Sequence, residues 1–112
     1  MRAIEQLELA ARLLEEESNV GLWVSSDDCS DNRRRRQLLR EADWAVSDAH
    51  RCLPGDAAIA ALMAKVEPLA DVVTDTMGVN HELDLKVSEA RQEAEELANR
   101  LRARAVRAPS KP

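Results

Sequence analysis

A heptad stripe near the C-terminus of this 112-residue chain constrains its fold more than any other feature. Its apolar residues recur at alternating spacings of four and three, without an intervening Gly or Pro: Leu83, Val87, Ala90, Ala94, Leu97 and Leu101. That spacing places these side chains along one side of an α-helix. The stripe therefore predicts a helical protein in which some other surface covers them.

Two surfaces are candidates for covering this stripe. The stripe spans under three heptads, which is short for an independent coiled coil and favours packing inside the domain. The alternative is a self-association seam, in which the same residues meet a second copy. The two arrangements are compatible if a homodimer extends the bundle. Ala90 and Ala94 in the middle of the stripe require a close approach by whatever covers it.

Three further amphipathic segments complete a small all-α domain. We expect a four-helix bundle over residues 1–104, with helices over about 2–17, 31–53, 57–77 and 81–104, and a basic flexible tail over 105–112. Suitable N-caps are Ser30 or Asp31 for the second helix, Asp56 for the third and Asn80 for the fourth. Pro68 falls inside the third helix and predicts a kink there.

The predicted connection over residues 18–32 is longer than most helix–helix connections. Trp23 in its apolar first half is expected to plug the end of the bundle, with an exposed partner-binding loop as the alternative. Cys29 in its polar second half is expected to be an exposed thiol. Cys52 shares the apolar side of the second helix with Leu38 and Ala42, which predicts that it is a small core residue.

The net charge of −5 is unevenly distributed. Residues 1–32 hold two basic and eight acidic groups, whereas residues 33–53 hold six and three. The overall acidity argues against a dedicated nucleic-acid binder. Charges near the start exclude a signal peptide, and no apolar run is long enough to cross a bilayer. We therefore expect a soluble cytoplasmic protein.

The second helix carries the main candidate binding site. One narrow sector holds Arg33, Arg36, Arg40, Trp44 and Arg51, and it lies about 150° from the centre of the helix's apolar side. Trp and Arg are enriched in binding hot spots, so this sector is a candidate contact for another protein. The alternative is a solvated basic face whose Trp44 is covered by the first helix or by the 18–32 connection.

The first helix is apolar on two sides. Ile4, Leu7 and Leu14 line one side, while Leu9 and Leu13 lie one turn apart on nearly the opposite side. Such a helix lies between two layers of its own domain, or its second side meets another chain. Leu9 and Leu13 are therefore candidate self-association residues.

The sequence gives no positive sign of catalysis, a cofactor or a metal site. His50 and Cys52 are two residues apart on a helix, so their side chains diverge by about 200° and suit zinc poorly. The segment that begins at Asp27 lacks the Gly and Glu of a calcium loop. The Gly residues stand in predicted turns and form no phosphate-binding motif.

We therefore expect a non-enzymatic protein-binding module, an adaptor, regulator or inhibitor of the kind that phages and mobile elements carry. It would act by occupying a partner's surface. The first alternative is a structural subunit of a larger helical assembly. The second is a nucleic-acid-binding accessory protein that uses the basic cluster Arg33–Arg40. Glu41, Asp43 and Asp48 interrupt the basic stripe of this helix, which weakens that alternative.

Overall fold

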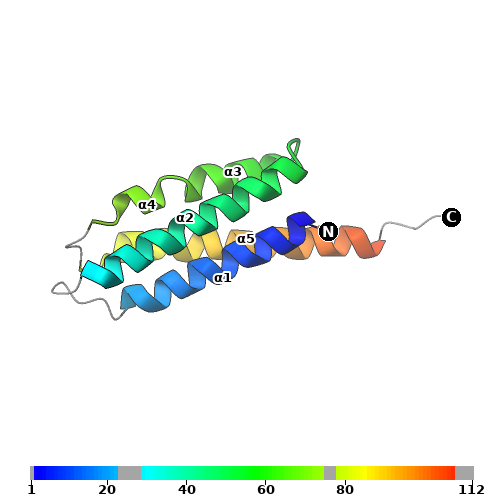
Figure 1. Ribbon diagram of the computed structural model, residues 1–112. Coiled ribbons are helices and arrows are strands. Elements are labelled where there is room, and N and C mark those ends of the chain that lie inside the picture. Colours follow the sequence, from blue (N-terminus) through cyan, green and yellow to red (C-terminus); the bar gives the residue numbers. More distant parts are fainter. Residues whose placement is uncertain (1, 23–28, 75–77, 108–112) are drawn as a thin grey trace.

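The computed structural model describes residues 2–22, 29–74 and 78–107, and this part of the chain contains helices and no strand (Figure 1). The helices are α1 (Arg2–Leu22), α2 (Cys29–Cys52), α3 (Ala57–Val66), α4 (Leu69–Val72) and α5 (His81–Arg107). The predicted all-α bundle is confirmed.

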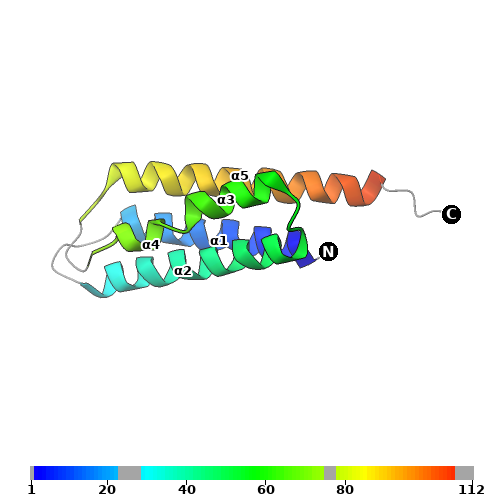
Figure 2. The same ribbon diagram turned by 90° about the horizontal axis from the view of Figure 1, so that it is seen from above.

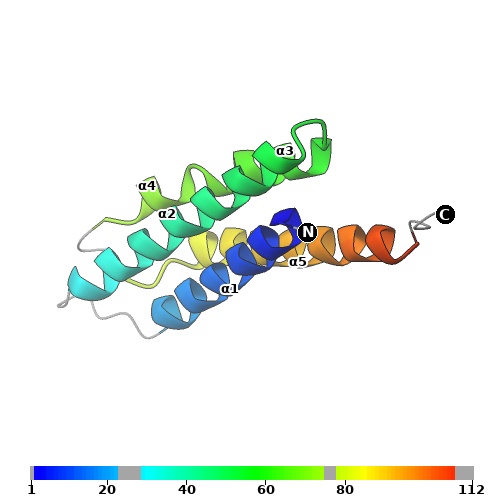
Figure 3. The same ribbon diagram turned by 45° about the vertical axis from the view of Figure 1, so that its right-hand side comes forward.

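The helices form a ring in which α2 and α5 lie diagonally opposite. α1 packs between α2 and α5 on one side, and α3 with α4 packs between them on the other (Figure 2). α1 runs antiparallel to both α2 and α5, so α2 and α5 run in the same direction. The C-terminal end of α5 extends past the start of α1 (Figures 1 and 3).

Matching heptad stripes on three helices build the core. α1 contributes Ala3, Leu7, Ala10 and Leu14, α2 contributes Leu39, Ala42, Val46 and Ala49, and α5 contributes its whole predicted stripe. Because Leu83, Val87, Ala90, Ala94, Leu97 and Leu101 are each at most 6% exposed, they pack inside the domain. The structure thus has the packing inside the domain that the short stripe favours, and a self-association seam formed by the same residues stays a prediction.

Two helix boundaries differ from the prediction around the first connection. α1 continues to Leu22 instead of ending near residue 17, and α2 begins at Cys29 instead of residue 31. The predicted connection over 18–32 is therefore mostly helical, and Trp23 lies outside the described residues. α5 likewise continues to Arg107, so residues 105–107 are helical, while 108–112 lie outside the described part.

The predicted third helix consists of two helices. Asp56 caps α3, because its Oδ1 accepts hydrogen bonds from the backbone N–H groups of Ala58 and Ile59, at 3.0 and 3.2 Å. α3 ends at Val66 and α4 begins at Leu69, after the turn that contains Pro68. A kink within one continuous helix is not confirmed: proline lacks the N–H that would continue the helical hydrogen bonds. Met77 lies outside the described residues.

Cys52 is exposed, so its predicted place in the core was wrong. It is the last residue of α2, beyond Ala49, the final buried residue of that helix. The position of a residue in the helical repeat predicts which way its side chain points. Burial also requires a neighbouring helix at the same level along the bundle axis. The other predicted core residues Leu38, Ala42, Ala45 and Ala49 are buried.

Candidate functional site

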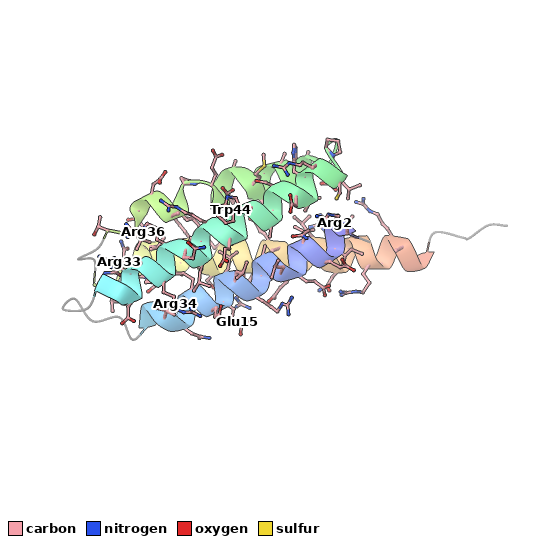
Figure 4. The ribbon with its side chains drawn as sticks, viewed as in Figure 1. Arg2, Glu15, Arg33, Arg34, Arg36 and Trp44 are labelled. Carbon is pink, nitrogen blue, oxygen red and sulfur yellow. The ribbon has the colours of Figure 1, made fainter. Side chains whose placement is uncertain are left out.

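The predicted contact residues of α2 lie on the outside of the bundle. We call Arg33, Arg36, Arg40, Trp44 and Arg51 the Arg/Trp face. Figure 4 labels Arg33, Arg36 and Trp44 of this set. Trp44 is 59% exposed, so neither α1 nor any other described segment covers it. Arg33, Arg40 and Arg51 are also exposed. This placement agrees with the direction that helical phase predicted.

The arginines of this face have different roles within the fold. Arg36 is half-buried and donates a hydrogen bond to the carbonyl oxygen of Val73, at 3.4 Å, which ties the end of α4 to α2. Arg51 is paired with Asp48 on its own helix at 3.0 Å. Arg33 and Arg40 form no ion pair or side-chain hydrogen bond within the described part of the chain. They are the arginines most available to a partner.

Acidic side chains border the Arg/Trp face on the α3 side. Asp43 is half-buried, and burial raises the pKa of its carboxyl, with the negative charge of Glu67 adding to that rise. The shift favours the neutral form of Asp43.

Leu9 and Leu13 divide between surface and core. Leu9 is 36% exposed, whereas Leu13 is half-buried and packs against the core. Both side chains still line one shallow surface hollow, together with Arg12 and Asn19. Whether this surface meets a second copy stays a prediction.

The sequence analysis missed a buried charge cluster that joins three helices. Glu17 of α1 and Arg35 of α2 are both 0% exposed, and Arg35 Nε donates a hydrogen bond to Glu17 Oε1 at 2.9 Å. Arg35 Nη2 lies 3.7 Å from Asp84 Oδ1 of α5. Arg35 Nη1 donates to Asn32 Oδ1 at 3.4 Å and to the carbonyl oxygen of Gly78 at 3.5 Å. One arginine therefore reaches across the bundle.

A heptad signal for this cluster was present in the sequence. Glu17 follows Ala10 and Leu14 at spacings of seven and three, and Arg35 precedes Leu39 and Ala42 at spacings of four and seven. Both residues thus continue the core stripes of their helices. Four consecutive arginines resemble one basic surface, although Arg35 alone among them points into the core.

Gly21 provides the space that the guanidinium occupies. A Cβ at this position would lie 3.2 Å from Arg35 Nη2 and 3.3 Å from Asp84 Oδ1. The cluster is also incompletely satisfied: Glu17 Oε2, Arg35 Nη2 and Asp84 Oδ1 are buried without a hydrogen-bond partner among the described residues. The attraction between the charges stabilises the fold, whereas the unpaired buried polar atoms destabilise it because they have lost their hydration.

Burial raises the pKa of Glu17 above its ordinary value of 4.5. The hydrogen bond and positive charge of Arg35 act in the opposite direction, and the negative charge of Asp84 adds to the rise. The folded state therefore holds a proton on Glu17 at pH values where the unfolded state has lost it. Stability from the neutral form is fully present below about pH 4.5 and is lost as the pH rises through the folded-state pKa.

Substituting Glu17→Gln should reveal this linkage. Because the variant cannot ionise there, its free energy of unfolding relative to the wild type should increase as the pH rises from about 4.5 through the folded-state pKa of Glu17, and it should level off above that pKa. Urea unfolding at a series of pH values measures this difference. Glu16→Gln, at the exposed neighbouring position, is the matched control for the substitution itself. A difference between Glu17→Gln and the wild type that stays constant with pH would contradict the assigned direction.

The described part of the chain contains no candidate metal-binding cluster and no candidate membrane span. No group of three or more His, Cys, Asp or Glu side chains there could hold a metal ion. Within that same part, each helix is too short or too polar to cross a membrane. No protein-family model matches the chain, and neither the curated proteins nor the solved structures compared with it gave a match.

Proposed function

We propose that this protein is a non-enzymatic protein-binding module that presents the Arg/Trp face of α2 to an acidic protein surface. The observation that carries the proposal is the 59% exposure of Trp44 on a face that also bears Arg33 and Arg40. Neither arginine is used by an ion pair in the described part of the fold. This face therefore has the composition of a binding hot spot, and Arg33 and Arg40 make no ion pair among the described residues that would give them a role in the fold.

The energetic argument depends mainly on the indole ring. Covering the remaining exposed area of Trp44 would contribute on the order of 3 kcal/mol. Exposed arginines contribute less individually, but they select an acidic partner and accelerate encounter. A partner that offers carboxylates around an apolar patch fits both parts of this face.

A structural subunit is the second candidate function. Leu85 of α5 is 60% exposed, and Val79 just before that helix is 50% exposed. We infer this alternative from two exposed aliphatic side chains near the start of α5, which a larger assembly would cover. Nucleic acid fits less well, because Trp44 is the only aromatic on the Arg/Trp face and base stacking needs a series of them.

The double variant Arg40→Ala/Trp44→Ala should lose partner capture while keeping its fold. Both side chains are exposed, so the free energy of unfolding should change by no more than about 1 kcal/mol. The full chain serves as bait in a lysate of its native host, and mass spectrometry identifies the captured proteins. Circular dichroism checks that each bait is folded.

Arg12→Ala is the matched control, because it removes an exposed arginine from α1 instead of α2. It should retain the proteins that the wild type captures. The same set of captured proteins with the double variant and with the wild type would contradict the proposed function.

A further inference from the structure

A second outward face, on α5, carries the opposite charge. We call Glu82, Leu85, Glu89, Gln92 and Glu96 the α5 outer face, and all of these residues are exposed. They recur at spacings of three and four, so they form one line along the helix. Glu82 is paired with Lys86 at 3.4 Å, whereas Glu89 and Glu96 have no direct ion pair within the described residues.

The two faces point in opposite directions. α2 and α5 occupy diagonal positions of the ring, with α1 on one side and α3 with α4 on the other (Figure 2). Each helix turns its apolar side towards the common core, so its outer face points away from the other helix. One copy therefore exposes a basic line with Trp44 on one side and an acidic line with Leu85 on the other.

We propose that the partner of the Arg/Trp face is the α5 outer face of a second copy of this chain, in antiparallel orientation. This inference rests on the proposed function and names its partner. The spacings of the two lines agree when α5 of the second copy runs opposite to α2. One register then gives every pair at once: Arg33 with Glu96, Gln37 with Gln92, Arg40 with Glu89, Trp44 with Leu85, and Ser47 with Glu82.

Parallel orientations match these lines poorly. Arg33 and Arg40 can also be placed opposite two glutamates seven residues apart in a parallel pair. In those registers Trp44 then faces Glu93 or Arg100 instead of an aliphatic side chain. The antiparallel register alone combines both charge pairs with the contact between the two exposed apolar side chains, Trp44 at 59% and Leu85 at 60%.

This contact cannot close between two copies. It joins different faces of the two partners, and those faces lie on opposite sides of each copy. Each added copy leaves one basic and one acidic face free, so assembly continues in a row with alternating copies reversed. The expected behaviour is concentration-dependent growth beyond a dimer. It should weaken with salt, because exposed ion pairs are screened.

Charge reversal tests the proposal with the full chain. Sedimentation velocity at about 10 μM to 1 mM protein should show wild-type oligomers that lengthen with concentration. Arg33→Glu/Arg40→Glu places glutamates at both pairing positions of each outer face, and Glu89→Arg/Glu96→Arg places arginines at all of them, so each variant alone should be monomeric. An equimolar mixture should assemble again, because every contact in it joins opposite charges.

Matched controls distinguish the effect of charges on the two outer faces from the effect of a changed net charge. Arg12→Glu/Arg104→Glu and Glu5→Arg/Glu15→Arg alter the same numbers of exposed charges elsewhere, and both should assemble like the wild type. Circular dichroism verifies that each variant is folded. Raising the salt from about 0.05 to 0.5 M should weaken wild-type association roughly tenfold or more.

Cysteine crosslinking tests the register. In a background with Cys29→Ser and Cys52→Ser, a mixture of Gln37→Cys and Gln92→Cys chains should form a mixed disulfide under mild oxidation. Ser47→Cys mixed with Gln92→Cys should not, because the two positions are ten residues out of register, about 15 Å along the helix.

Several outcomes would overturn the proposal. These are a wild type that stays monomeric over the whole concentration range at low salt, association that survives either charge reversal, and equal crosslinking in both cysteine pairs. A monomeric chain that still captures a different protein through Trp44 would overturn this pairing and leave the proposed function standing. A monomeric chain without Trp44-dependent capture would overturn both.

Discussion

Arg35→Ala is expected to lower the free energy of unfolding by about 3–5 kcal/mol at pH 7. Glu17 and Arg35 are both 0% exposed, so removing the guanidinium leaves the carboxylate of Glu17 in the core without its cation. Asp84 loses its nearby positive charge at the same time. Urea unfolding followed by circular dichroism measures the loss.

Arg34→Ala is a close control, because it removes the same side chain from the next position of α2. Arg34 pairs with Glu16 at 3.4 Å, and both side chains are more than half exposed. Surface pairs of this kind contribute about 0–1 kcal/mol. Equal losses in Arg34→Ala and Arg35→Ala would contradict the structural role assigned to Arg35.

The deficit of Arg35→Ala should also shrink in acid. Burial already raises the pKa of Glu17, and loss of Arg35 removes the hydrogen bond and the charge that oppose the rise. At about pH 4 the variant can bury Glu17 as a neutral acid at lower cost than at pH 7. Unfolding measurements at the two pH values check this dependence.

The fold was predictable from the sequence because local and tertiary patterns agree along most of the chain. The alternating spacing that defines the stripe of α5 also places Leu7 and Leu14 of α1 and Leu39 of α2 inside the same core. The two patterns disagree at Gly21, where glycine locally favours a turn but the residue lies within α1. Packing against Arg35 offsets the low helix propensity of glycine there, and that contact joins residues from different helices.

The candidate site was predictable in part for a related reason. The outward direction of Trp44 follows from the phase of α2 alone. The burial of Arg35 was missed because a run of arginines resembles one surface, although successive residues on a helix differ in direction by about 100°. Pairing with Glu17 and Asp84 depends on which helices are neighbours, and the sequence alone did not supply that arrangement.

The relation between the outer faces of α2 and α5 depends on the fold and cannot be read from either segment of the sequence alone. Their opposite charges become relevant because the ring places the two helices diagonally, so the faces cannot meet within one chain. A bundle built this way satisfies its core internally and still leaves Trp44 and Leu85 exposed. Core stability and surface association can therefore be altered independently by substitution.

Leu14→Ala tests the core side of that separation and should lower the free energy of unfolding by about 2–5 kcal/mol. Leu14 is 0% exposed among α2 and α5, and truncation removes buried apolar atoms and leaves a cavity. Leu9→Ala makes the same substitution on the same helix at a residue that is 36% exposed, so it should cost less than about 1 kcal/mol. Urea unfolding of the two variants measures the contrast. Equal losses would mean that α1 does not turn its Leu14 side towards the core, because only the difference in burial separates these two leucines.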